Sequence, residues 1–162
     1  MGMLKRAGLA VSVMCLFTGA VSADPAEMMK AAGEEASWLF IQTAGSAKFD
    51  GSILVLENVS PVTTMFSDRP VRVAETIPTE SFVAGWAANG PDSFESDPPN
   101  AALTSIVDGA LRTTTVILSE PQLEGATLTF KAQPLEGELP AMGAQTSIFF
   151  DDIHWEPGGI GN

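Results

Sequence analysis

Short strand-forming segments, separated by turn-forming residues, follow one another along most of this chain and restrict it to a fold built from β-strands. Asp50-Gly51 and Asp108-Gly109 are pairs typical of tight hairpin turns. Residues 126–132 alternate apolar and polar side chains, as in a strand with one wet face. The pattern predicts an antiparallel β-sandwich of about seven strands with one short helix, and an open β-barrel is the alternative.

Seven strands can be placed along the chain from these signals. They are expected at residues 38–41, 52–57, 62–67, 102–107, 111–118, 126–132 and 146–155. Since short turns separate the first three, we expect them to form a three-stranded meander. Pro121 cannot donate a backbone hydrogen bond to a neighbouring strand, so we expect it to end the strand that begins at Leu111.

One helix is expected after Pro78. Thr79 is a residue type that caps helix N-termini, and Asn89-Gly90 is a stop signal. Phe82, Val83 and Trp86 lie at the spacing of one apolar stripe. We expect this stripe to close one end of the β core, and the alternative is that Trp86 lines a ligand pocket.

The first 23 residues have the composition of a secretory signal peptide. Lys5 and Arg6 precede an apolar run of 13 residues, Leu9 to Val21, and small residues up to Ala23 form a cleavage site. The run is too short to span a bilayer as a stable helix. We therefore expect an exported protein, periplasmic or extracellular, with no membrane insertion after the signal is cleaved.

The remaining chain is expected to form one domain. Residues 24–36 are predicted to be a flexible or helical lead-in, 37–157 a single β-sandwich domain and 158–162 a tail. The chain's one cysteine, Cys15, lies in the signal segment, so the domain has no disulfide and depends on its core.

Charge excludes some classes of partner. The chain has 20 acidic and 8 basic residues and a formal net charge of −12. A surface of this sign repels phosphates, so we expect no nucleic-acid partner and no binding to anionic membranes. The excess of acid is typical of a highly soluble protein.

Asp68, Arg69 and Arg72 are the first candidates for a ligand-binding site. They lie at a strand end that Pro70 interrupts, where two guanidinium groups could bind an anion through paired hydrogen bonds. The alternative is an ion pair that fixes the turn. Trp86 and Phe94, the latter in the long polar loop 91–100, are further candidates. If exposed, these two rings and that of Trp155 could bind a sugar.

Three acidic residues of the same loop, Asp92, Glu95 and Asp97, are candidate calcium ligands. Their spacing does not match an EF-hand, and the alternative is solvated loop charge. No other cofactor is indicated, since the chain has one histidine and no phosphate-binding glycine-rich loop.

His154 and Asp152 are the candidate catalytic pair. They share one face of the last expected strand, where the carboxylate could orient the imidazole and a serine such as Ser67 could serve as nucleophile. No Gly-x-Ser-x-Gly segment accompanies them. The sequence therefore predicts a binding protein rather than an enzyme, with a hydrolase as the alternative.

The run MFSDRP at residues 65–70 stands between Trp38-Leu-Phe-Ile-Gln-Thr and Asp97-Pro-Pro-Asn-Ala. Together these segments resemble a group of small exported bacterial proteins of uncharacterised function, over residues 37–150. The resemblance implies a secreted domain of similar length, and it implies no reaction, cofactor or ligand.

The leading hypothesis is thus a non-enzymatic, exported β-sandwich that binds a small ligand or a protein partner. A structural or envelope-interaction protein is a further alternative, and it would show an exposed apolar patch. The sequence leaves the oligomeric state open.

Overall fold

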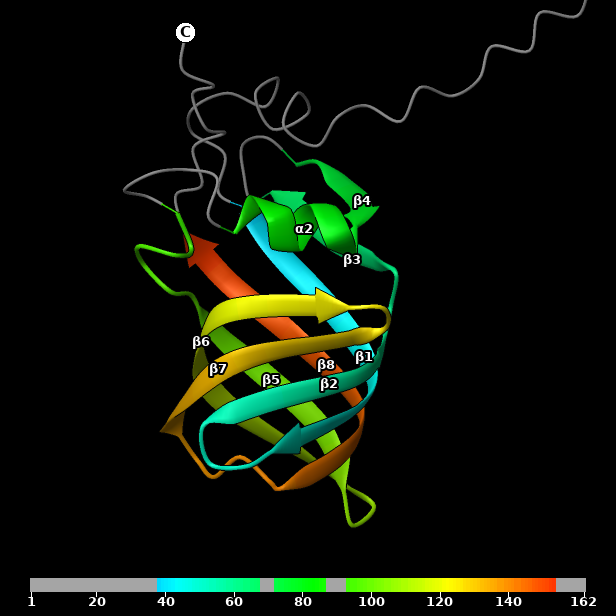
Figure 1. The fold of residues 1–162 in the computed structure, drawn as a ribbon, viewed down its shortest axis with the longest axis vertical. Coiled ribbons are helices and arrows are strands. Elements are labelled where there is room, and N and C mark those ends of the chain that lie inside the picture. The colour runs from blue at the N-terminus through cyan, green and yellow to red at the C-terminus, as the bar shows by residue number, and fades with distance from the viewer. Residues whose placement is uncertain (1–37, 68–71, 87–92, 154–162) are drawn as a thin grey trace, which may run out of the picture.

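The computed structural model describes residues 38–67, 72–86 and 93–153, with the backbone alone for 151–153. The elements in this part of the chain (Figure 1) are β1 Trp38–Phe49, β2 Ile53–Val59, β3 Val62–Ser67, β4 Ala74–Pro78, α2 Thr79–Gly85, β5 Asn100–Val107, β6 Ala110–Glu124, β7 Thr127–Glu136 and β8 Met142–Ile153. The mainly-β prediction with one short helix is confirmed. No helix among the described residues is long and apolar enough to cross a membrane.

The eight strands belong to one antiparallel sheet, in the order β2-β7-β6-β5-β8-β1-β3-β4. The second half of β1 also pairs with β2, so hydrogen-bonded neighbours lead from β1 through β8, β5, β6, β7 and β2 back to β1. Figure 1 shows the result as two layers, with β2, β7 and the end of β6 in front of β1, β5 and β8. One sheet folded over a shared core is compatible with the predicted sandwich and with its open alternative.

The first three strands do not form the expected meander. β2 pairs with β1 through residues 44–49, and β3 pairs with the same edge of β1 through residues 38–41. β2 and β3 therefore follow one another along β1 and do not lie side by side. Ser60 and Pro61 interrupt the strand between β2 and β3. The other edge of β2 pairs with β7, and the other edge of β3 pairs with β4.

Pro121 does not end its strand, which is a second correction. β6 continues to Glu124 because a β-bulge accommodates the proline. Ser119 pairs with Lys131, and Gln122 pairs with Thr129. Two residues, Glu120 and Pro121, are thus set against one on β7, and Glu120 has a φ of 51°. β5 pairs with β6 only as far as Ile117, so the last part of β6 extends beyond it.

Two turns have the geometry that their sequences predict. Asp108 and Gly109 have φ values of 51° and 77°, as a two-residue hairpin turn between β5 and β6 requires. The Asp50 carboxylate accepts hydrogen bonds from the backbone N–H groups of Ser52 at 2.9 Å and Ile53 at 2.8 Å. These bonds close the β1–β2 hairpin.

Helix α2 lies across one end of the folded sheet (Figure 1), as the apolar stripe predicts. Phe82 and Trp86 are buried, and their rings pack edge to face with centroids 5.7 Å apart. Phe82 also lies against Phe40 of β1 and Phe150 of β8, at 5.1 and 5.2 Å. The helix therefore closes the core through an aromatic cluster.

Candidate functional site

A cleft of about 760 Å³ lies beside helix α2. Three segments line it: residues 59–61 at the β2–β3 break, residues 78–80, 83 and 84 at the start and on one side of the helix, and residues 121–126 of the β6–β7 hairpin. These segments are far apart in the sequence, and the fold brings them together at one end of the sheet.

The helix divides its side chains between the core and the cleft. Glu80, Val83 and Ala84 line the cleft, while Phe82 and Trp86 are buried in the aromatic cluster. The spacing of one, four and five residues from Thr79 puts the first three on neighbouring positions of one helix face. The same short helix thus closes the core with one face and forms a cleft wall with the other.

The opposite wall depends on the bulge in β6. Residues 118–124 lie beyond the reach of β5 and pair with β7 alone among the described strands. Pro121, Gln122, Leu123 and Glu124 line the cleft from this segment. The irregularity around Pro121 therefore supplies a wall to the cleft instead of ending the strand.

Backbone hydrogen bonds hold the floor of the cleft to both walls. The Thr79 N–H donates to the Pro61 carbonyl oxygen at 3.0 Å, which joins the helix to the floor. The Val59 N–H donates to the Ala126 carbonyl oxygen at 3.0 Å, which joins the floor to the hairpin. Backbone bonds, and not side chains alone, therefore fix the floor relative to both walls.

A buried polar cluster beneath the floor strengthens the join to the helix. The Gln42 side-chain amide donates to the Ser60 carbonyl oxygen at 3.1 Å, and the Thr79 hydroxyl donates to the same oxygen at 2.8 Å. The Thr63 hydroxyl donates to Gln42 Oε1, which also lies 3.1 Å from the Thr79 hydroxyl oxygen, so the one Thr79 proton is shared between Gln42 and Ser60. Gln42, Thr63 and Thr79 are at most 2% exposed, so the cluster satisfies polar groups that water does not reach.

This cluster corrects the expected role of Thr79. Thr79 is the first helical residue, and Pro78 occupies the N-cap position with no side-chain cap hydrogen bond. The threonine hydroxyl bonds inward to Gln42 and Ser60 instead of capping the helix. The local sequence favours the cap, but hydrogen bonds to the buried Ser60 carbonyl and Gln42 amide oxygens are stronger than a cap bond at the surface, because water does not compete for them.

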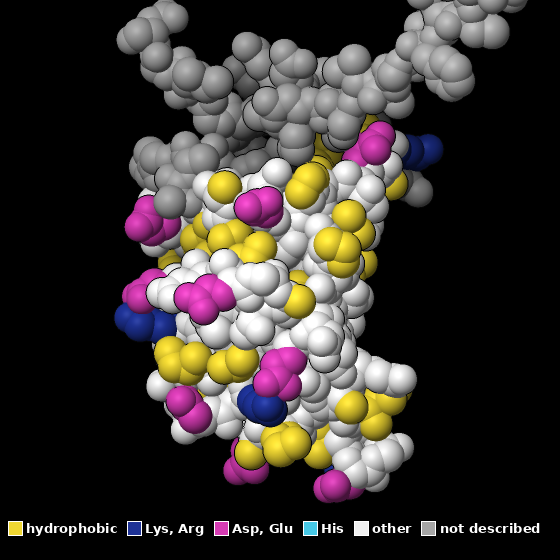
Figure 2. Space-filling model, turned by 45° about the vertical axis from the view of Figure 1, so that its right-hand side comes forward, with side chains coloured by type: hydrophobic (Ala, Val, Ile, Leu, Met, Phe, Trp, Pro, Cys, Tyr) yellow, Lys and Arg dark blue, Asp and Glu magenta, His cyan; other side chains and the backbone are white. Residues whose placement is uncertain are grey.

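The charged side chains among the described lining residues are those of Glu80 and Glu124, one on each wall. Both are exposed. The ion pairs found in the described part of the chain join Lys48 to Glu57 and Lys131 to Glu120, so neither cleft carboxylate has a basic partner there. Figure 2 turns this side forward and shows hydrophobic side chains gathered below the helix with acidic side chains beside them.

Trp86 and Phe94, two of the predicted ligand-binding residues, lie together in the core. Their side chains are 3% and 2% exposed, and their ring centroids are 4.8 Å apart. Phe94 anchors its loop, in which the Glu95 N–H donates to the Trp86 carbonyl oxygen at 3.2 Å. Neither ring offers an exposed face to a sugar, which is what the aromatic-platform hypothesis needs of them.

The Asp-Arg-Pro corner is only partly described. Asp68, Arg69 and Pro70 lie outside the described residues, and Arg72 is exposed with a φ of 56°. The structure thus neither joins nor separates the proposed anion-binding groups.

The predicted calcium ligands are also divided. Asp92 lies outside the described residues, and Glu95 and Asp97 are exposed. Within the described ranges, no group of three or more His, Cys, Asp or Glu side chains could hold a metal ion. The calcium site stays a prediction.

Of the hydrolase hypothesis, only Ser67 is described in full. His154 lies outside the described residues, and Asp152 is described by its backbone in β8. Ser67 is 8% exposed, and its hydroxyl accepts a hydrogen bond from the Val73 N–H at 2.8 Å. This hydroxyl therefore closes the β3–β4 connection, which is a structural task.

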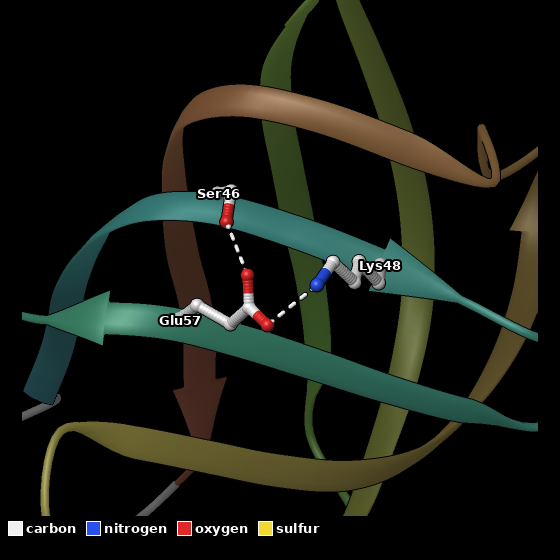
Figure 3. Close-up of polar contacts among 3 residues, drawn as sticks. All are labelled: Ser46, Lys48 and Glu57. Atoms are coloured by element: carbon white, nitrogen blue, oxygen red, sulfur yellow. Dashed lines mark hydrogen bonds and ion pairs between the residues drawn. The ribbon is translucent and has the colours of Figure 1, made fainter.

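A second polar contact on the sheet lies away from the cleft (Figure 3). The Glu57 carboxylate accepts hydrogen bonds from Lys48 Nζ at 2.5 Å and from Ser46 Oγ at 3.1 Å. The hydrogen bond from Lys48, followed by that from Ser46, lowers the pKa of Glu57 below its usual value. The three residues form a cross-strand contact between β1 and β2, and we assign them no ligand.

Large exposed hydrophobic side chains come from several elements. They are Val62 of β3, Leu111 of β6, Leu135 of β7 and Met142 of β8. The apolar patch expected of an envelope-interaction protein would have to be assembled from such residues, and that alternative stays a prediction.

Comparison with known proteins adds no further constraint. No protein-family model, curated protein or solved structure matches the chain. The resemblance to small exported bacterial proteins accordingly stays a prediction, and the function has to be argued from the site.

Proposed function

We propose that this chain is an exported, non-enzymatic binding protein that holds a small, largely apolar ligand in the cleft beside α2. One observation carries the proposal: the cleft is held by backbone hydrogen bonds between its floor and both walls, and its volume of about 760 Å³ lies in the range of roughly 300 to 1,000 Å³ typical of small-molecule sites. The signal-like segment at residues 1–23 supports export.

The composition of the lining supports a ligand with an apolar body. Val59, Pro61, Val83 and Leu123 contribute aliphatic surface from the floor and from both walls. Leu123 and Val83 are half-buried against the core, which holds their positions. Small-molecule sites commonly combine such a lining with a few polar groups that orient the ligand.

The proposal moves the site away from the residues that the sequence favours. Trp86 and Phe94 are buried in the core and form no cleft wall, whereas the exposed Ala84 two positions before Trp86 lines the cleft. The predicted small-ligand function is kept, and its location becomes the space between α2 and the β6–β7 hairpin.

Filling the cleft tests the proposal. Ala84 is exposed and lines the cleft, so Ala84→Trp should occupy the cleft without disturbing the core. We expect the neutral dye Nile red to bind the unaltered protein at one saturable site and to bind Ala84→Trp at least tenfold more weakly. The matched control is Ala110→Trp, at an exposed position at the start of β6, which should bind as the unaltered protein does.

Two results would contradict the proposal. One is the absence of saturable dye binding to the unaltered protein. The other is equal affinity in Ala84→Trp and in the unaltered protein, since the dye would then occupy another part of the molecule.

A further inference from the structure

We propose that the ligand of the cleft is a cationic amphiphile, with an apolar body and an amine or quaternary ammonium head. The inference rests on the proposed function and specifies the chemistry of its ligand. It follows from the placement of two carboxylates, Glu80 and Glu124, on opposite walls of an otherwise uncharged lining among the described residues.

The carboxylates belong to separate elements that the fold brings to one cleft. Glu80 is in the first turn of α2, and Glu124 is the last residue of β6. The floor bonds from Thr79 to Pro61 and from Val59 to Ala126 fix the two elements to the same short segment. The separation of the two walls is therefore set by the backbone and not by a long side chain.

The charge of both carboxylates is available to a ligand. Elsewhere in the described chain, Lys48 and Lys131 pair with Glu57 and Glu120, which neutralises those two carboxylates. Glu80 and Glu124 make no such pair with a described residue. An ammonium head at the cleft would be attracted by these carboxylates, and an anionic head would be repelled by them.

The apolar lining determines the remainder of the ligand. A small hydrated cation such as sodium would leave the aliphatic surface of Val83 and Leu123 in contact with water. An alkyl or ring body covers that surface while its head stays at the exposed carboxylates. The combination of lining and charge thus distinguishes an amphiphile from a free metal ion and from a neutral lipid.

Three ligands that share the same decyl chain and differ only in the head group test the inference. Decyltrimethylammonium, decyl glucoside and decyl sulfate have cationic, neutral and anionic heads, and each would displace Nile red below its micelle-forming concentration. We expect decyltrimethylammonium to bind at least tenfold more tightly than decyl glucoside, with decyl sulfate the weakest. Raising the salt concentration should reduce the difference, since the carboxylates are exposed.

Charge removal then locates the preference. In the double variant Glu80→Gln/Glu124→Gln, the affinity for decyltrimethylammonium should fall by at least tenfold, to that for decyl glucoside. The control Glu136→Gln/Glu138→Gln removes the same charge from exposed positions at and beyond the far end of β7, and should keep the preference. The control separates the effect of the cleft from that of the net charge of −12.

The outcomes separate this inference from the proposed function. Equal binding of the three ligands, sensitive to Ala84→Trp, would overturn the cationic preference and leave the cleft as the binding site. A preference that survives Glu80→Gln/Glu124→Gln, or that the control variant also loses, would likewise overturn it. Failure of all three ligands to displace the dye would overturn the inference, and dye binding insensitive to Ala84→Trp would overturn the proposed function as well.

Discussion

The hydroxyl of Thr79, the first residue of α2, donates a hydrogen bond of 2.8 Å to the carbonyl oxygen of Ser60, at the break between β2 and β3. This contact attaches the helix to the β2–β3 connection. β2 and β3 pair with successive parts of one edge of β1 on either side of it. The floor of the cleft and one of its walls therefore depend on the same buried cluster.

Thr79→Val should destabilise the fold and weaken ligand binding together. The substitution keeps the shape of the side chain but removes a buried hydroxyl that bonds to Gln42 and Ser60. We expect a loss of about 1 to 3 kcal/mol in the free energy of unfolding, measured by urea denaturation. Thr104→Val is the control, because its hydrogen bond to Thr113 is exposed, and it should change stability by less than about 0.5 kcal/mol. Equal effects of the two variants would argue against a special role for the cluster.

Phe94→Ala should be strongly destabilising. The side chain is 2% exposed and packs against Trp86 and Phe40. Its removal should cost about 3 to 5 kcal/mol, from lost burial and the cavity left behind. Leu111→Ala, at a side chain that is 73% exposed, is the control and should change little. A small effect of Phe94→Ala in denaturation experiments would show that the ring is not a core residue.

Gly143→Ala should also destabilise the protein, through lack of space. A Cβ at Gly143 would lie 2.5 Å from Cβ of Ser105, whose hydroxyl is buried against that of Thr146. Both atoms are close to the backbone, so β5 and β8 would have to move apart. We expect a loss of about 1 to 3 kcal/mol, measured by thermal or urea unfolding. Unchanged stability would mean that the two strands are further apart than described.

Asp50→Asn should weaken the fold at neutral pH and have less effect in acid. Hydrogen bonds from the backbone N–H groups of Ile53 and Ser52 lower the pKa of Asp50 below 3.8. Because the folded-state pKa is depressed, the carboxylate stabilises the fold above pH 3.8, and this contribution is lost as the pH falls through the folded-state value. Melting temperatures of the two proteins should therefore differ at pH 7 and converge as the pH falls through the depressed pKa of Asp50. A difference that persists unchanged into acid would contradict this account.

Local signals predict the parts of this fold that local physics determines. Asp50-Gly51 and Asp108-Gly109 make the hairpins that their sequences favour, and Phe82 and Trp86 of the predicted apolar stripe are buried, whereas Val83 lines the cleft. The direction of the Thr79 hydroxyl could not be predicted in this way, because its partners are 19 and 37 positions away in sequence.

The sequence predicts the strand neighbours wrongly in part, and it does not predict the cleft. β3 pairs with β1 because β2 has β7 on its other edge and leaves no edge for β3. The sequence of β3 alone does not contain that information. Pro121 is predicted to end its strand because proline donates no backbone hydrogen bond. The bulge that accommodates it depends on the pairing with β7, which the local sequence does not reveal. The cleft combines three segments that are distant in the sequence, so no local pattern predicts it.

The central claim is that a small ligand occupies the space between α2 and the β6–β7 hairpin. Methyl-resolved NMR during titration with decyltrimethylammonium tests it most directly, because Val59, Val83 and Leu123 line three sides of the cleft. We predict that the methyl signals of these three residues shift together and saturate, while those of the exposed Leu111 and Leu135 stay in place. Saturable shifts confined to residues outside the cleft, or no saturable shift at all, would contradict the account.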